Sequence, residues 1–305
     1  FGVVQDAAVH KYVALVGTML SEQTTRSKLP WTFIVLDTDG VNAFAAPGGF
    51  VHITRGALSL IKSEAELAGV LGHEIAHVAQ KHTVNALRKS KGVQIGTSEA
   101  SASRSAFLGA LANRTYDMVL ENSFDRGDEL DADKEGILMA QKAGYAGAGL
   151  SEFLARLAER NKGQAEKNGL FASHPETQER IGKVKDLAGS KPGAVVAVRY
   201  ASAIKYQPTE LTKVATVVEG SAGLTGGGNE QAKPEEKKAE EKKKGFGLSN
   251  LTKTASAGKN EQQVAASGGA RGVGADRLAK GGDNPSPVKP AISPAELSAF
   301  RKGIA

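Results

Sequence analysis

One segment constrains the fold of this chain more than any other: residues 63–89, SEAELAGVLGHEIAHVAQKHTVNALRK. Ser63 followed three residues later by Glu66 is the capping-box signature of a helix N-terminus, so we predict one long helix over residues 64–89. Its apolar residues fall at roughly 120° to 200° around the axis from His73: Leu67, Leu71, Ile75 and Val78. One face of the helix therefore packs into a core, while the other presents histidines to a polar site.

The two histidines of the HEIAH motif, His73 and His77, are four residues apart and share one helix face. Two imidazoles one turn apart can bind a single Zn²⁺, and thiolate ligands are excluded because the chain has no cysteine. Glu74 is too close to His73 in sequence to be an easy third ligand, but it is placed to accept a proton from water at the metal. On a continuous helix His82 falls at roughly 180°, so we exclude it as a ligand and expect a buried, hydrogen-bonded histidine.

A third ligand is available in the acidic segment DELDAD at residues 128–133. Glu129 and Asp133 share one face of a predicted helix. Glu129 would complete a His, His, Glu set that leaves one position for water, and Asp133 could accept the free ring N–H of His73. The alternative is a solvated acidic face, because other carboxylates lie nearby: Asp125, Asp128 and Asp131. The presence of HEIAH favours the metal site.

The remaining histidines carry weaker signals. His174 precedes a predicted helix start at Pro175, so it could donate to an oxyanion in the site or simply cap the helix or lie on the surface. Arg180 could pair with a carboxylate on any surface. His10 and His52 have no partner at ligand spacing, and we interpret both as structural or exposed.

The other elements predict an α+β fold that is mostly helical. Aromatic and β-branched runs separated by turn residues predict strands at 31–39, 41–46 and 50–54. Tight turns between them imply a small antiparallel three-stranded sheet beside the histidine-bearing helix. Further helices are predicted at residues 5–20, 103–122, 126–143, 148–161 and 175–187.

Composition changes sharply after the last of these helices. We predict a folded domain over residues 1–218, a disordered Gly/Lys/Glu-rich segment over 219–290 and a short terminal helix within 291–305. The whole chain has a net charge of +6. Most of this excess lies in residues 246–305, which carry eight basic and four acidic side chains. Because the folded part is nearly neutral, the charge gives no argument for nucleic-acid binding. We expect a solvated tail, with contact to an anionic membrane surface or an acidic partner as the alternative.

Five segments together resemble the family of CAAX prenyl endopeptidases and HtpX-like zinc metallopeptidases, most closely its soluble, periplasmic bacterial branch. The resemblance covers about residues 5–187 and is carried by NAFAAPGGFVHITRGAL (42–58), SEAELAGVLGHEIAHVAQKH (63–82), ELDAD (129–133), AGYAGAG (143–149) and ASHPETQERI (172–181). It implies a zincin-like fold of the gluzincin type.

The resemblance also implies roles for individual residues. One zinc ion per chain is expected on His73, His77 and Glu129, with Glu74 as catalytic base. Asp133 is expected to contact a zinc ligand. His174 is expected near the metal, where the equivalent histidine of some relatives takes the fourth zinc position and holds the enzyme latent.

The same resemblance implies a substrate strand and a cellular location. The strand around 42–46 is expected to form an edge beside the cleft, where extended or misfolded polypeptide adds as a further strand on Asn42, Ala43, Phe44 and Ala45. The location would be the periplasm or cell envelope, with any signal or anchor segment outside this chain, and the role would be envelope protein quality control. No run is long enough to span a bilayer, which makes prenylated-protein processing doubtful.

Two other classes of function remain to be distinguished from an endopeptidase. One is a peptide-binding, chaperone-like module with a structural zinc site, against which an intact Glu74 argues because a structural site needs no base. The other is an assembly protein that acts through its tail.

Overall fold

The computed structural model describes residues 2–89, 124–162, 170, 174, 178–210 and 289–304. The helix predicted at 103–122, the domain boundary at 218 and nearly all of the segment predicted to be disordered lie outside these residues. Among the described helices, none combines the length and the apolar character needed to cross a membrane.

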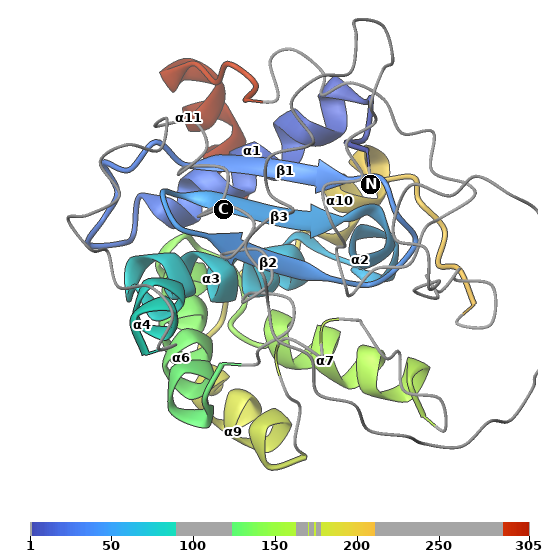
Figure 1. Cartoon of the computed structure of the whole chain (residues 1–305). Coiled ribbons are helices and arrows are strands. Elements are labelled where there is room, and N and C mark those ends of the chain that lie inside the picture. Colours follow the sequence, from blue (N-terminus) through green and yellow to red (C-terminus); the bar gives the residue numbers. More distant parts are fainter. Residues whose placement is uncertain are drawn as a thin grey trace, which may run out of the picture.

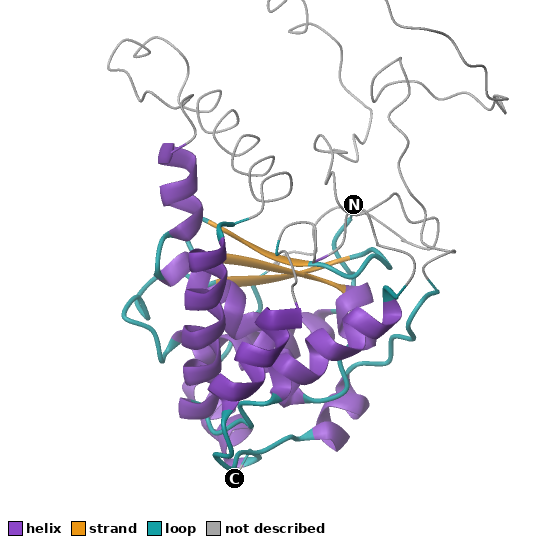
Figure 2. Cartoon of the chain, turned by 90° about the horizontal axis from the view of Figure 1, so that it is seen from below, coloured by secondary structure: helices purple, strands orange, loops and turns teal. Residues whose placement is uncertain are grey.

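A small three-stranded sheet is covered on one face by helices (Figures 1 and 2). The strands are β1 (Thr32–Leu36), β2 (Ala43–Ala46) and β3 (Phe50–Thr54). The helices are α1 (Ala7–Ser21), α2 (Arg55–Leu60), α3 (Glu64–Ala79), α4 (His82–Lys89), α6 (Arg126–Lys142), α7 (Gly149–Arg160), α9 (Gln178–Ala188), α10 (Ala197–Ala203) and α11 (Pro294–Lys302). The predicted fold class, mostly helical with a small sheet beside the HEIAH helix, is confirmed.

The predicted strand order is wrong in one respect: the sheet is mixed rather than antiparallel. β3 lies in the middle, antiparallel to β2 and parallel to β1. The connection over residues 37–42 crosses the end of β3 to reach the far edge, where Thr54 Oγ1 donates to Gly40 O and accepts from the amide of Asn42. Arg55 also pairs with Asp37 and Asp39 in this connection. These contacts join residues 37–42 to the last residue of β3 and to the residue after it, so turn residues between neighbouring strands did not reveal the crossing.

The predicted helix over 64–89 is also corrected, because it is two helices. Ser63 caps α3 by accepting from the amide of Glu66, which is one half of a capping box, while the Glu66 carboxylate accepts from the amide of Lys62. α3 ends at Ala79, Lys81 adopts a left-handed backbone with φ of 64°, and α4 begins at His82. A left-handed non-glycine residue ends a helix at a cost in strain that the surrounding structure must offset.

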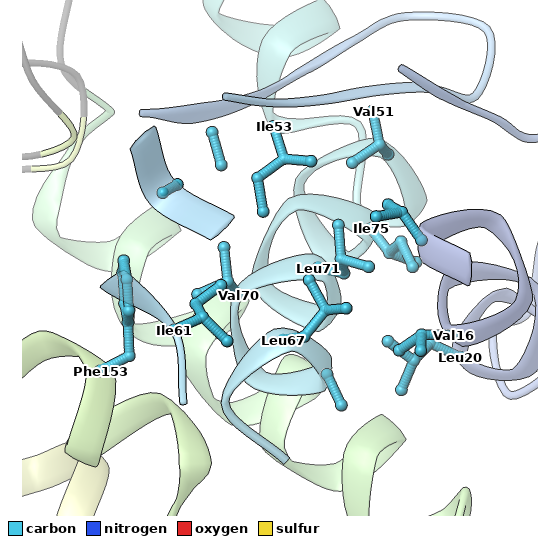
Figure 3. Close-up of a cluster of buried hydrophobic side chains, with 14 of the residues drawn as sticks. Val16, Leu20, Val51, Ile53, Ile61, Leu67, Val70, Leu71, Ile75 and Phe153 are labelled. Carbon is cyan, nitrogen blue, oxygen red and sulfur yellow. The ribbon is translucent and has the colours of Figure 1, made fainter. Parts of the chain in front are cut away.

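The core lies between the sheet and α3 (Figure 3). Leu67, Leu71 and Ile75 are fully buried along α3. They are surrounded by buried side chains from the sheet, from α1 and from α7: Val51, Ile53, Val16, Leu20 and Phe153. Helix α3 is therefore enclosed on most sides, as its apolar face predicted.

Two glycines let α6 approach α3 closely. A Cβ atom on Gly72 would lie 2.8 Å from the carbonyl oxygen of Gly136, and one on Gly136 would lie 2.7 Å from the backbone nitrogen of His73. Such separations leave no room for a side chain, so glycine is required at this crossing. The crossing lies directly beside the first histidine of HEIAH and fixes the distance between the two helices there.

The C-terminal helix α11 packs against α1, beside the first part of the chain (Figure 1). Phe300 meets Tyr12 edge to face with ring centroids 5.8 Å apart, and Ile304 is buried in the main core. Lys11 pairs with Glu296, and Arg301 pairs with Glu22. The structure thus has a helix within residues 291–305, and this helix packs against the folded body.

Candidate metal site

Four side chains that are distant in sequence converge beside α3. His73 and His77 come from α3, Glu129 from the first turns of α6, and His174 from the segment that precedes α9. One potential ligand atom of each lies within 4.8 Å of all the others, and all four residues are buried. His73 Nε2 lies 3.0 Å from His77 Nε2 and 3.2 Å from His174 Nδ1, and His174 Nδ1 lies 2.8 Å from Glu129 Oε1.

The local sequence explains why the site forms on these helices. Asp125 caps α6 by accepting from the amide of Asp128, so the helix begins one turn before Glu129. Glu129 and Asp133 then share one face of α6, which the crossing at Gly136 presses against α3. The acidic segment is therefore not a solvated face at these two positions, because both side chains are buried.

Asp133 contacts both a histidine of the motif and an arginine. Its Oδ1 lies 2.8 Å from His73 Nδ1, which is the contact that the sequence suggested. Arg180 of α9 donates to both carboxylate oxygens of Asp133, at 2.7 and 2.8 Å, and its Nη1 lies 2.8 Å from Glu129 Oε2. Burial alone would raise the pKa of Asp133, but the hydrogen bonds from Arg180 and His73 outweigh it and hold the pKa below its usual range.

Arg180 is a site residue that the sequence analysis left as a surface arginine. Its guanidinium is buried and bridges two carboxylates. Burial opposes its charge, but the two carboxylates raise its pKa above the ordinary value. Its position in the first turn of α9 could have identified it, because that position brings Arg180 to the same end of the helix as His174.

Glu74 is buried beside the cluster, with 1% of its surface exposed. Neither of its carboxylate oxygens has a hydrogen-bond partner among the described residues, and His174 Nε2 lies 3.5 Å from Oε1. Burial raises the pKa of Glu74 to about 7, and the neighbouring His73 partly offsets this rise. A buried carboxylate left without partners needs a ligand, because an unpaired polar group in a core is costly.

The surroundings of Glu129 and His77 favour an ionised carboxylate and a neutral imidazole at these two positions. Burial works to raise the pKa of Glu129, but His174, His73 and Arg180 lower it overall, so the group stays ionised. Burial and then the neighbouring cations and histidines lower the pKa of His77 well below its ordinary value, so it stays neutral. Neutral imidazole and ionised carboxylate are the forms that bind a metal.

The residues fit a zinc ion by the chemistry and spacing of their donor atoms. Donors around 2.0–2.2 Å from a tetrahedral ion lie roughly 3.3 Å apart. The Nε2 atoms of His73 and His77 are 3.0 Å apart. His73 Nε2 lies 3.6 Å from Glu129 Oε2, and His77 Nε2 lies 3.5 Å from Glu129 Oε1, so all three separations are close to the expected value. Nitrogen and carboxylate donors in this arrangement suit Zn²⁺, and no thiolate is needed.

The strand predicted to bind substrate is an edge of the sheet. β2 pairs with β3 alone among the described strands, and Asn42, Ala43, Phe44 and Ala45 are all buried. The Val41 carbonyl, just before this strand, accepts a hydrogen bond from the amide of Leu170 at 3.0 Å. The segment that leads to His174 therefore already contacts the beginning of the strand.

The other described histidines are not among the four clustered groups. His10 is buried in α1 with its Nε2 2.9 Å from Val4 O, and His52 stacks on Phe44. His82 is buried and hydrogen-bonded, as predicted, and is not one of the four clustered groups. The reason given for excluding it was wrong, however, because it assumed a continuous helix, and the break at Lys81 places His82 beside His77.

A buried helix that carries HEIAH, with a glutamate from a second helix beside both histidines and an unpaired glutamate between them, defines a metallopeptidase. The chain belongs to peptidase family M48, whose sequence profile matches residues 7–188. Membership confirms the resemblance inferred from the five segments, and it implies a metal cofactor and polypeptide substrates.

Individual relatives share the same part of the chain. The beta-barrel assembly-enhancing protease of Escherichia coli is 25% identical over 205 residues, which make up 63% of this chain and 42% of that protein. The mitochondrial metalloendopeptidase OMA1 of Schizosaccharomyces pombe is 30% identical, over 57% of this chain and 52% of its own length. The metalloprotease LoiP of Escherichia coli is 27% identical, over 52% and 62% respectively. The chain thus spans about two fifths of the beta-barrel assembly-enhancing proteases that it matches.

Proposed function

We propose that this protein is a zinc-dependent endopeptidase that hydrolyses peptide bonds in extended or misfolded polypeptides. The observation that carries the proposal is the convergence of His73, His77 and Glu129 around one point, with the unpaired carboxylate of Glu74 beside them. When bound there, zinc supplies Lewis-acid chemistry that acidifies water and polarises a peptide carbonyl.

In this proposal each buried residue of the site has one task. Glu74 accepts the proton of the attacking water and then passes it to the leaving amine, a role that suits a carboxylate whose pKa burial raises to about 7. Asp133 accepts the Nδ1 proton of His73 and so keeps its Nε2 lone pair on the metal side. Arg180 holds Asp133 and Glu129 in place and balances their charge.

The edge strand β2 supports extended polypeptide as the substrate class. A peptide that adds to a sheet edge as a further strand binds through its backbone, so it must be locally unfolded. The four residues that we assign to this contact are Asn42, Ala43, Phe44 and Ala45. Quality control in the bacterial cell envelope is the setting we propose, supported by the relative named for β-barrel assembly and by the absence of cysteine.

We further propose that His174 blocks the site in this structure. Its Nδ1 lies 2.8 Å from Glu129 Oε1 and 3.2 Å from His73 Nε2, the position of a fourth ligand rather than of a group waiting for an oxyanion. The amide of Leu170, four residues earlier, donates to the carbonyl oxygen of Val41, just before the strand that we assign to substrate. Leu170 and His174 therefore lie at the residue just before the strand edge and at the fourth metal position, which is the arrangement expected of a latent enzyme.

The direct test of the function is proteolysis of an unfolded substrate such as casein. Zinc-loaded protein should cleave it, a chelator should stop cleavage, and added zinc should restore it. Glu74→Gln should keep its zinc and lose at least about a hundredfold in rate, because the ligands remain while the general base is gone. Wild-type cleavage by purified Glu74→Gln would contradict the role of Glu74.

A second candidate function is favoured by one observation. Four protein groups close the cluster, which is typical of a structural zinc site in a peptide-binding module. His174→Ala separates the two: it should raise casein cleavage if the site is latent, and it should yield no cleavage at all if zinc is only structural. His10→Ala, which removes a buried histidine that is not one of the clustered groups, is the matched control and should leave cleavage unchanged.

A further inference from the structure

His82 lies outside the four-residue cluster but touches it through His77. His82 Nδ1 is 3.1 Å from His77 Nδ1, while His77 Nε2 faces the cluster, 3.0 Å from His73 Nε2. The His77 and His82 rings meet at 80° with centroids 5.0 Å apart, and 5% of His82 is exposed. The contact is therefore buried and lies on the side of His77 opposite its potential ligand atom.

The chain reaches this contact only through a strained backbone. On a continuous helix, His82 would lie roughly 140° around the axis from His77, and the rings could not meet. Instead α3 ends at Ala79, and Lys81 is one of two non-glycine residues with positive φ in the described part of the chain. A strained residue of this kind persists only where the surrounding structure holds it in place, and such residues are often found beside functional sites.

The position of the proton on each imidazole ring explains why this conformation matters. An imidazole that binds a metal through Nε2 must carry its proton on Nδ1, and a partner must accept that proton. For His73 the partner is Asp133. For His77 the atom opposite Nδ1 is the Nδ1 of His82, which can accept only when the His82 proton is on Nε2.

Two carboxylates of α6 favour that form of His82. Its Nε2 lies 3.4 Å from Asp131 Oδ2 and 3.8 Å from Asp128 Oδ1. Negative charge on this side attracts the Nε2–H and so leaves Nδ1 free to accept. The sequence analysis treated these two aspartates as solvated neighbours, and in the structure they form the outer end of a chain that runs through His82 to His77.

We propose that His82 is a positioning residue of the metal site, which accepts the Nδ1 proton of His77 and fixes the tautomer and ring orientation with which His77 binds zinc. This inference deepens the proposed function and rests on its metal site. It makes the two histidine ligands unequal: Asp133 supports His73 directly, whereas carboxylates support His77 only through His82.

The test compares three replacements of His82 by their zinc affinity, measured in competition with a chromophoric chelator. His82→Asn places a carboxamide oxygen near the position of Nδ1 and keeps an acceptor for His77. His82→Gln extends its amide towards the position of Nε2, and His82→Ala removes the acceptor. We expect the Ala and Gln variants to bind zinc about 10- to 100-fold more weakly, the usual loss for a partner of a metal ligand, and the Asn variant to stay much closer to wild type.

A second measurement separates positioning from loss of packing. Replacing zinc with cobalt(II) gives visible absorption bands that report ligand geometry, and these bands should shift in His82→Ala but not in His82→Asn. His10→Ala is the matched control, since it removes a buried, hydrogen-bonded histidine and should lower stability without changing affinity or bands. All variants are compared at a temperature where each is folded.

Two results would overturn the inference while leaving the endopeptidase intact. One is wild-type zinc affinity and an unchanged cobalt spectrum in His82→Ala. The other is an equal loss in the Asn and Gln variants that follows their loss of stability, as in the His10→Ala control. If the wild-type protein itself binds no zinc, the proposed function fails as well, and this outcome is distinguishable from the first two.

Discussion

At the scale of single residues, Asp133 links the metal site to the helix that follows His174. It is fully buried and shared between His73 on one side and Arg180 on the other. Replacing it changes the orientation of a ligand without removing any ligand. Asp133 is therefore the best single residue with which to test how the residues that contact the metal ligands hold those ligands in place.

Asp133→Asn should weaken zinc binding about 10- to 100-fold, because a carboxamide accepts a ring proton less well than a carboxylate and turns a donor group towards Arg180. The measurement is a zinc titration of folded protein. Asp186→Asn, at an exposed position on α9, is the control and should change nothing. Equal affinities for Asp133→Asn and wild type would show that His73 is held by packing alone.

The sequence predicted four residues of the site because they form two pairs that obey helix periodicity. His73 with His77, and Glu129 with Asp133, are pairs at spacing four, and that spacing places both members on one face whatever the tertiary structure. His82 and Arg180 were not recognised as site residues. Their positions depend on a left-handed residue and on the packing of α9, and neither is encoded in a local spacing rule.

At the scale of elements, the crossing of α3 and α6 determines the distance between the histidines and Glu129. Gly136→Ala should lower the free energy of unfolding by about 1–3 kcal/mol and weaken zinc binding, because the new Cβ would lie 2.7 Å from the backbone nitrogen of His73 and push the helices apart. Urea unfolding and zinc titration measure the two effects.

The control for this prediction is Gly182→Ala in α9, where a new Cβ would meet no atom within 4 Å. It should raise stability by up to about 1 kcal/mol through helix propensity alone. If Gly136→Ala also raises the free energy of unfolding, the close crossing of α3 and α6 is not required for the site.

The hairpin of β2 and β3 contains a titrating group away from the metal. His52 stacks on Phe44 with ring centroids 4.5 Å apart and lies opposite it in the strand register. Burial lowers the pKa of His52 from 6.5 to about 4. The unfolded chain therefore binds a proton on this residue at pH values between about 4 and 6.5, where the folded chain does not.

Stability should consequently fall as pH drops through this window, and the contribution of His52 between pH 7 and pH 5 should be about 2 kcal/mol or less. His52→Phe keeps a ring against Phe44 and removes the titration, so its urea-derived stability should depend less steeply on pH. The same slope in both proteins would assign the acid sensitivity to other groups.

The strands show where element-level prediction stops. Alternation and turn residues located β1, β2 and β3 within a few residues, but α2 and α10 were not predicted and the strand order was wrong. Order depends on the connection over 37–42, which is held by Thr54 and Arg55. These contacts are long-range, and a local pattern does not contain them.

At the scale of the whole molecule, the C-terminal helix is tied to the start of α3. Glu64, the first residue of α3, accepts from Tyr12, Tyr145 and Arg199. Arg199 in turn donates to the carbonyl oxygen of Phe300 in α11 and lies over its ring, 4.1 Å from the centroid. The end of the chain thus supports the helix that carries the metal site, at the end of that helix away from the histidines.

Deleting residues 220–305 should therefore have two separable effects. Casein cleavage per folded molecule should persist, because the described site lies within residues 73–180. The free energy of unfolding should fall by about 2–4 kcal/mol, because the buried Ile304, the Phe300 contacts and two ion pairs are lost. A deletion variant that is fully stable, or one that is folded but inactive, would contradict this division of roles.

The central claim is that one zinc ion is held by His73, His77 and Glu129. Diffraction data collected on either side of the zinc absorption edge from crystals of the purified protein test it directly. The account predicts a single anomalous peak about 2.0–2.2 Å from the Nε2 atoms of both histidines and from a carboxylate oxygen of Glu129. A peak located elsewhere, or Glu129 directed away from both histidines in zinc-loaded crystals, would contradict it.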